Sequence, residues 1–403
     1  MIDRIEVLDD YTLKVHYKDV FAPGLSSWTM PIIPKHLLEG RSLLNTRFSR
    51  HPVGTGPYRF RLWKAQEKIV LESNKNYFEG KPILDYVVLR VLQDTATTFL
   101  ELLAQGVDYA SLTPLQYRFQ ATGSIFRRNF RRFKMPSRSY VYMGYNLRNS
   151  LFKDVRVRQA LSMAVDKKKI IKAVLLGEGL ESTGPFTPTQ WAYNPEVKPF
   201  LYSPQRAREI LHECGWEDKD GDGILEKDGR KFEFTVITNQ GNLERQRVLE
   251  LIQEDLNKVG VRVKIKVVEW STFINEFINK RSFEAVLLGW SLGPEPDIFD
   301  IFHSSRQREG QFNFVGYSNR EVDRLIEEAR GTLDRERRRS IYHRLQEIIY
   351  QEQPYMFLYV PFDFFALHKR FKNVVLKKAG IFHNFKDWYV PCSQQRYKAL
   401  FSR

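Results

Sequence analysis

The chain has 403 residues, of which 42% are hydrophobic and 28% charged, a composition that excludes a disordered protein. Its net charge of +15 permits nucleic acid, an anionic membrane or acidic ligands as partners, although a well-mixed basic surface is the simpler interpretation. Only Cys214 and Cys392 are present, which excludes a disulfide scaffold and a four-cysteine zinc site.

The first residues predict a β-hairpin. Apolar and polar residues alternate over residues 5–17, on both sides of a turn at Asp9 and Asp10. No apolar run approaches the roughly 18 residues of a membrane span. The first residues also lack the apolar segment of a signal peptide.

Turn and cap residues separate short elements in the first third of the chain. Prolines and glycines make residues 31–57 rich in loops, and Asp94 caps a helix that Gly106 ends. In chain order we expect a short helix at 35–38, paired strands at 58–63 and 68–72, a strand at 86–92, a helix at 95–105 and a strand at 107–112.

Helices and strands alternate through the middle of the chain. Asp154 and Asp166 each precede a helical pattern, and Ser203-Pro204 is a strong helix start. We expect a strand at 140–145, helices at 155–165 and 167–176, a loop at 180–203 and a helix from 204 that stops at Gly215.

Residues 232–288 carry the clearest architectural signal, a strand–helix–strand–helix–strand series with short connections. Such a series predicts a largely parallel sheet, in which ligands bind beyond the carboxyl ends of the strands. Gly289-Trp290-Ser291 stands at such an end. Further along we expect helices at 321–330, opened by a capping box at Ser318, and at 335–352, then strands at 355–360 and 364–368.

No set of residues predicts catalysis, a metal centre or a cofactor site. The eight histidines are scattered, and Gly54-Thr55-Gly56 lacks the other residues of a phosphate-binding loop. Asp218, Asp220 and Asp222 match the start of a calcium loop, but Gly229 stands where the last, bidentate acid belongs. We favour an acidic turn over a weak calcium site, and we expect no enzyme.

Two aromatic features leave alternatives open. Phenylalanines interleave with arginines over residues 126–138, as in single-strand nucleic-acid binders, but an amphipathic element with a solvated basic face is the better interpretation. We therefore expect no nucleic-acid partner. Trp290 is either part of the core or a flat wall of a binding cleft.

Several motifs resemble the family 5 extracellular solute-binding proteins, the oligopeptide, dipeptide and nickel-binding components of ABC importers. His51-Pro-Val-Gly-Thr-Gly-Pro-Tyr-Arg-Phe60 resembles the family signature NPVGTGPYxF. Further matches, in family order, are Asn76–Pro82, Phe152–Leu161, Ala164-Val-Asp166, Gly289-Trp290-Ser291 and Asn313–Asp323.

This resemblance implies an α/β, two-lobed periplasmic-binding-protein-like fold of type II, with mixed sheets and flanking helices, whose interlobe cleft closes on a small, peptide-like solute. It implies a monomer in the periplasm or elsewhere outside the cytoplasm that delivers the solute to a membrane ABC permease. We expect the first lobe at residues 1–141, the second at 142–356, and a return to the first lobe with a tail at 357–403.

The chain departs from the family pattern in two ways. The family begins with a signal peptide and a substantial part of the first lobe, so we expect an N-terminally truncated fold: a fragment, a mis-started reading frame or a non-functional relic. Peptide-binding members also carry an aspartate, three residues after the cleft tryptophan, that pairs with the α-amino group. Gly293 stands here, with Glu295 and Asp297 as possible substitutes, so the sequence leaves the ligand open.

The candidate ligand-binding residues come from the motifs and from the expected passages between the lobes. They are Trp290, Ser291, Asn313, Tyr145, Asn146 and Tyr359. The alternative function is the ligand-sensing half of a cytoplasmic transcription regulator, whose DNA-binding domain would lie upstream.

Overall fold

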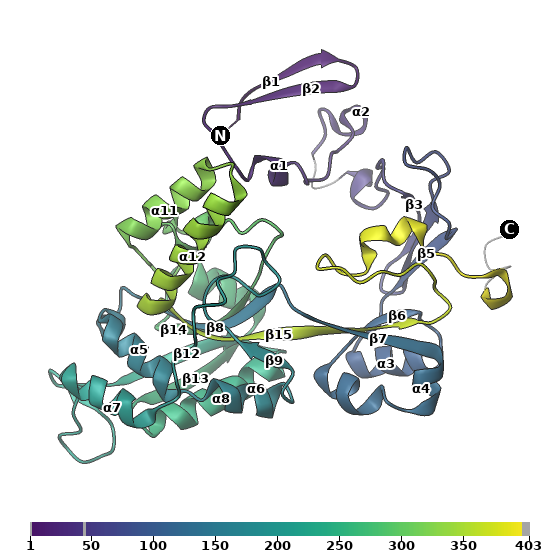
Figure 1. The fold of residues 1–403 in the computed structure, drawn as a ribbon. Helices are drawn as coiled ribbons and strands as arrows, with labels where there is room; N and C mark the ends of the chain where they lie inside the picture. The colour runs from purple at the N-terminus through teal and green to yellow at the C-terminus, as the bar shows by residue number, and fades with distance from the viewer. Residues whose placement is uncertain (1, 43–45, 397–403) are drawn as a thin grey trace. The chain divides into compact units, whose positions relative to one another are not determined.

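The computed structural model describes residues 2–42 and 46–396, and every structural statement below concerns these residues. The chain forms two compact units (Figure 1). Unit 1 comprises residues 1–28 and 136–362, and unit 2 comprises residues 29–135 and 363–403. The two lobes expected to close on a ligand, with boundaries at 141/142 and 356/357, stay a prediction.

A mixed sheet forms the centre of unit 1. Strand β12 (Glu233–Asn239) pairs in parallel with β13 (Arg262–Val268) and with β14 (Ala285–Ser291), as the strand–helix series predicted. On its other edge β14 runs antiparallel to β8 (Ser139–Tyr145), which pairs with the first residues of β15 (Tyr355–His368). The sheet order is therefore β13-β12-β14-β8-β15.

The helices of unit 1 begin where cap residues predicted. Asp154, Asp166 and Ser203 each accept a backbone N–H bond from the first turn of the helix that follows. These bonds satisfy donors that a helix start otherwise leaves unpaired. The helices are α5 (Val155–Ala164), α6 (Lys167–Val174), α7 (Pro204–Glu213), α8 (Leu243–Asn257), α11 (Arg320–Gly331) and α12 (Arg335–Glu352).

Unit 1 has a hydrophobic core on each face of this sheet. Side chains alternate between the faces, so Met143 and Tyr145 of β8 join one core while Tyr140 and Tyr142 join the other. Helices α5 to α8 cover the first face, and α11 and α12 cover the second (Figure 1). Unit 1 is thus a three-layer α/β/α arrangement.

Unit 2 combines an antiparallel sheet with a helical pair. Its strands β3 (Tyr58–Lys64), β4 (Lys68–Ser73) and β5 (Tyr86–Arg90) confirm the predicted strand pair and the strand after it. The last residues of β15 pair with β6. The other elements are α2 (Lys35–Leu38), α3 (Thr95–Leu103), β6 (Tyr109–Leu112), α4 (Ser124–Asn129) and β7 (Phe130–Pro136). Phe126 and Phe130 are buried, so the interpretation of this basic stretch as an amphipathic element is confirmed.

The predicted hairpin is confirmed as β1 (Ile2–Asp9) and β2 (Thr12–Tyr17). Most of its apolar side chains are exposed: Val7 and Leu13 are cross-strand partners, with 71% and 59% of their surface accessible. A short helix, α1 (Gly24–Ser27), follows.

Three expectations about elements were wrong. The two strands expected at 355–360 and 364–368 form one continuous strand. The backbone N–H of Ser137 donates a hydrogen bond to the Pro361 carbonyl, so the sheet hydrogen bonding continues past the proline. The helix at 321 is capped by Asn319, not Ser318. The second helix expected in the series at 232–288 is instead the short α9 (Trp270–Thr272) followed by a π-type turn, η5 (Phe273–Ile278). The remaining short elements are β9 (Gly179–Glu181), β10 (Glu226–Lys227), β11 (Arg230–Lys231), α10 (Phe299–Phe302), η2 (Arg47–Ser49), η3 (Gln116–Gln120), η4 (Ser150–Phe152), η6 (Ser304–Arg306), η7 (Phe382–Asp387) and η8 (Cys392–Gln394).

Candidate functional site

A cavity of about 220 Å³ opens in unit 1 at the carboxyl end of β14. Trp290 and Ser291, the last residues of that strand, line it together with the loop that follows. Phe186 and Gln190 come from the loop before α7, and Phe312 from the loop before α11. We call this cavity the β14 pocket. It lies where an open sheet with parallel strands offers space for a ligand.

Aromatic rings form one wall of the β14 pocket. The Trp290 ring lies nearly parallel to that of Tyr142, with centroids 6.4 Å apart, and at 30° to that of Phe314. Phe312 meets it edge-on at 5.6 Å. Trp290 is half-buried and Phe312 is exposed, so part of this wall is accessible. Offset and edge-on ring pairs hold each other in fixed orientations, which gives the pocket a flat apolar surface.

Three carboxylates surround the pocket, and each is bound to an arginine. The ion pairs are Glu295 with Arg338, Asp297 with Arg330 and Asp300 with Arg306. Burial raises the pKa of Asp297, and the positive charge of Arg330 partly opposes that rise. The arginines therefore neutralise the acids that line the pocket.

Gly293 lies in the loop of the pocket, and its backbone carbonyl accepts a hydrogen bond from the buried Gln190 amide at 3.3 Å. A Cβ atom added at Gly293 would meet its nearest atom, the Glu295 carbonyl oxygen, at 3.9 Å. That is ordinary van der Waals contact, so packing does not require glycine at this position.

The other sequence-based candidates are placed away from this pocket. Tyr145 lies in the core against Phe152, and burial raises the pKa of its hydroxyl. Asn146 donates from its side-chain amide to the carbonyls of Phe283 and Arg281, at 2.8 and 3.3 Å. Both side chains therefore hold the structure around the end of β8.

Asn313 and Tyr359 are also buried. The Asn313 amide donates to the carbonyls of His303 and Tyr317, and its oxygen accepts the Tyr317 N–H. It thereby fixes the loop that carries Phe312. Burial raises the pKa of Tyr359, which packs in the core on β15. The structure brings Trp290 and Ser291 together in the pocket, while ligand contact by the other four residues stays a prediction.

Sequence reasoning missed Phe312, Gln190 and Phe186 as pocket residues. Phe312 directly precedes the matched segment that starts at Asn313, so extending that match by one residue would have included it. Gln190 and Phe186 lie in a stretch that carried no signal beyond its prolines.

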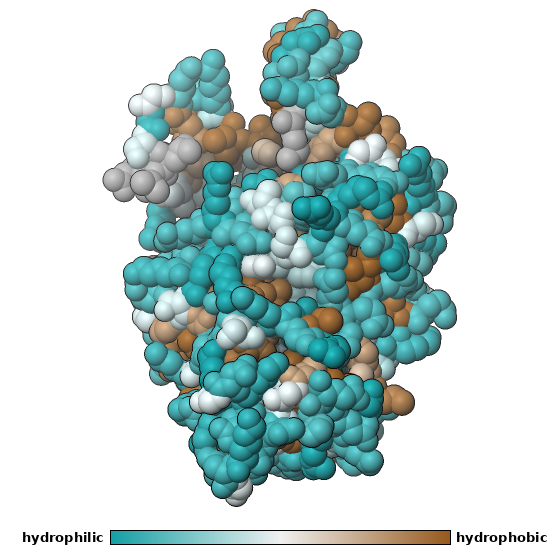
Figure 2. Space-filling view, turned by 90° about the vertical axis from the view of Figure 1, so that its left-hand side faces the viewer, coloured by the Kyte–Doolittle hydropathy of each residue, from teal (hydrophilic) through white to brown (hydrophobic). Residues whose placement is uncertain are grey.

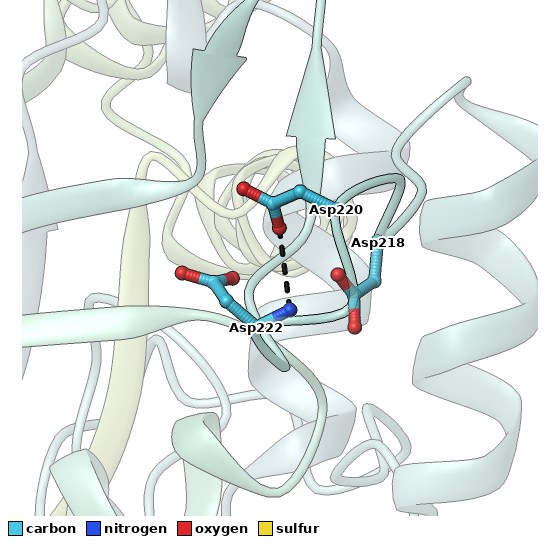
Figure 3. Close-up of side chains that lie close together, drawn as sticks. All are labelled: Asp218, Asp220 and Asp222. Carbon is cyan, nitrogen blue, oxygen red and sulfur yellow. Dashed lines mark hydrogen bonds between the residues drawn. The ribbon is translucent and has the colours of Figure 1, made fainter.

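The acidic loop forms a second cluster (Figure 3). Carboxylate oxygens of Asp218, Asp220 and Asp222 lie within 4.8 Å of one another, and all three residues are exposed. Figure 3 shows Asp220 accepting the backbone N–H of Asp222, at 3.2 Å. Lys231 donates to Asp220 at 2.8 Å and to Asp222 at 2.5 Å. The Lys231 ammonium therefore already pairs with two of the carboxylates that a metal cation would bind.

Among the described residues, no helix is long and apolar enough to cross a membrane. The face of the molecule in Figure 2 is mostly hydrophilic, with hydrophobic residues scattered among polar ones. Such scattering is normal for a protein surface and marks no particular site.

The fold is that of the ligand-binding proteins of the type II periplasmic class. The structure of the oligopeptide-binding protein AppA from Bacillus subtilis, in complex with a nonapeptide, superposes with a TM-score of 0.82 at 35% identity, over 97% of this chain and 78% of that one. NikZ from Campylobacter jejuni, in complex with Ni(L-His), gives a TM-score of 0.81 at 26% identity, over 96% and 78% of the two chains.

The sequence comparisons agree. The family model for bacterial extracellular solute-binding proteins, family 5 Middle, matches residues 1–310, and the chain belongs to this family. The oligopeptide-binding protein AppA from Bacillus subtilis (strain 168) is 36% identical, over 97% of this chain and 73% of that protein. Heme-binding protein A from Haemophilus influenzae is 28% identical, over 94% and 68%. The expected family, fold class and role as the solute-binding component of an ABC importer are confirmed.

Proposed function

We propose that this chain captures a peptide-like solute outside the cytoplasm, delivers it as a monomer to a membrane ABC permease, and holds an apolar or aromatic group of the solute in the β14 pocket. The likeness to the oligopeptide-binding protein AppA, in sequence and in its structure in complex with a nonapeptide, supports the peptide class. The same likeness favours import over the ligand-sensing half of a regulator.

The aromatic wall beside neutralised acids is the observation that carries the proposal. A ring or aliphatic chain laid on Trp290 and Phe312 loses water-exposed apolar surface, which is favourable at roughly 25 cal/mol per Å². A ligand ammonium would instead compete with Arg338 and Arg330 for Glu295 and Asp297. The pocket therefore selects an uncharged group.

The proposal includes no catalysis. The residues that line the β14 pocket include neither histidine, cysteine nor lysine, and their acids are engaged with arginines. A nucleophile with an adjacent general base is thus missing from these lining residues.

Replacement of Trp290 tests the proposal. Isothermal titration with a panel of short peptides, with and without aromatic side chains, should identify a ligand of the unmodified chain. Trp290→Ala should weaken the binding of that ligand by about 1–3 kcal/mol, the loss expected for an aromatic anchor, and Trp290→Phe should weaken it by less. The matched control is Trp270→Ala, which removes a half-exposed tryptophan of the same unit outside the pocket.

Thermal melting of each variant separates binding from folding. The Trp290 ring also packs on Tyr142 and Phe314, so a modest loss of stability accompanies Trp290→Ala. An unchanged affinity in Trp290→Ala, or an equal loss in Trp270→Ala, would refute the pocket assignment.

A further inference from the structure

The net positive charge of this protein comes from unit 2. Residues 1–28 and 136–362 contain 37 lysines and arginines against 38 aspartates and glutamates. Residues 29–135 and 363–403 contain 26 lysines and arginines against only 10 aspartates and glutamates. The smaller unit thus carries the whole net charge, and its field attracts anions.

A cavity of about 400 Å³ lies within this basic unit. We call it the basic pocket. Its walls come from the end of α4, from the residues that end and follow β15, and from the segment around η8. The lining residues are Arg128, Asn129, His368, Lys369, Arg370, Lys372, Ser393, Gln394, Gln395 and Arg396. Five of them are cations, and none is an acid.

Most of these cations keep their charge uncompensated. Arg370 forms an ion pair with the half-buried Asp108. Among the described residues, Arg128, Lys369, Lys372 and Arg396 have no carboxylate within ion-pair distance. Lys369 donates to the Arg127 carbonyl at 2.5 Å and Lys372 to the Lys369 carbonyl at 3.1 Å, contacts that position an ammonium without cancelling its charge.

His368 adds no charge to the basic pocket. The Nδ1 atom of His368 accepts the backbone N–H of Arg370 at 3.1 Å, which places the ring proton on Nε2, toward the Gln105 side-chain oxygen. Burial and the charge of Arg370 lower the pKa of His368 to about 4, so the ring is uncharged near neutral pH. Asn129 and Ser393 add neutral hydrogen-bond donors to the lining.

We propose that the basic pocket binds a phosphate group carried by a larger molecule. Guanidinium groups bind phosphate oxygens in pairs, and ammonium groups add point charges, so Arg128, Arg396 and Lys372 match this chemistry. The cavity of about 400 Å³ has room for more than one small group, since a water molecule occupies roughly 30 Å³. The phosphate is carried either by a soluble phosphorylated compound or by a phospholipid headgroup. This site is separate from the β14 pocket and does not depend on it.

Charge-removing variants in and outside the pocket test the proposal. The pocket variant is Arg128→Gln with Lys372→Gln. The matched control, Arg41→Gln with Lys75→Gln, removes the same charge from exposed residues of unit 2 outside the pocket. Circular dichroism and thermal melting verify that each variant folds. The probes are inorganic phosphate, glycerol phosphate, and vesicles of phosphatidylglycerol or phosphatidylcholine, all at low ionic strength because salt screens such contacts.

We expect glycerol phosphate to bind the unmodified chain at one site and more tightly than inorganic phosphate. The pocket variant should bind it at least about tenfold more weakly, and the control should change less than about twofold. Loss of binding to phosphatidylglycerol vesicles in the pocket variant alone would identify a lipid headgroup as the source. Absence of binding to every phosphate probe, or equal weakening in the pocket variant and the control, would overturn the proposal.

Discussion

The change Gly293→Asp should turn the β14 pocket into one that recognises an amino group. The nearest atom to a new Cβ would be the Glu295 carbonyl oxygen at 3.9 Å, and Gly293 is not among the glycines with a positive φ. An aspartate therefore fits without backbone strain. Its carboxylate would enter a pocket whose own acids are bound to arginines.

The expected gain follows from the strength of a charge-assisted hydrogen bond. Such a bond contributes about 1.5–3 kcal/mol, and each 1.4 kcal/mol changes affinity tenfold. A peptide with a free α-amino group should therefore bind the Gly293→Asp variant about 10–100 times more tightly than its N-acetylated counterpart. Repulsion from Glu295 and Asp297 is limited because both are neutralised by their arginine partners.

Isothermal titration of the two peptides against three proteins checks this prediction. The unmodified chain should bind them with similar affinity, and the Gly293→Asn control, which adds the same bulk without charge, should do the same. Only Gly293→Asp should discriminate. The reasoning is refuted if Gly293→Asp binds both peptides equally, or if the unmodified chain already prefers the free amino group by tenfold.

Three further predictions concern other parts of the chain. Burial lowers the pKa of Lys167 from 10.5 to about 8, so between pH 8 and 10.5 the unfolded chain keeps a proton that the folded protein has lost, and the stability of the fold should rise with pH. Lys167→Met should raise the free energy of unfolding by about 1–3 kcal/mol at pH 7 and flatten that rise, and urea titrations at pH 7 and pH 9.5 measure both effects. Because Lys231 already occupies the cluster at Asp218–Asp222, 1 mM calcium should leave the melting temperature unchanged, and micromolar binding by calorimetry would contradict this. Replacing the exposed pair Val7 and Leu13 by threonines should lower the binding of a hydrophobic dye while changing stability by less than about 0.5 kcal/mol; undiminished dye fluorescence would show that the hairpin is not its site.

The elements that sequence predicted best depend on local interactions. Asp154, Asp166 and Ser203 start helices through bonds to backbone N–H groups two or three residues away, so neighbouring residues contain the whole signal. Strand β15 was expected as two pieces because the bond that keeps Pro361 in the ladder comes from Ser137, far away in the chain. That partner is invisible to a local pattern.

The candidate site also has a part that the sequence predicted and a part that depends on contacts distant in the chain. Trp290 and Ser291 could be predicted, since a family motif and a strand end coincide there. Glu295 and Asp297 were the nearest acids for an amino group, but arginines of α11 and α12 bind them in the folded chain. No spacing in the sequence predicts those two ion pairs, because they form only when these helices pack beside the loop.

Strand β15 has a consequence for the order in which this protein acquires its structure during synthesis. It pairs with β8, more than 200 residues earlier in the chain, and its side chains join both cores of unit 1. A ribosome must therefore pass residue 355 before the sheet can be completed. Contacts at such long range make folding slow. The nascent chain thus remains incompletely folded until this strand has been synthesised.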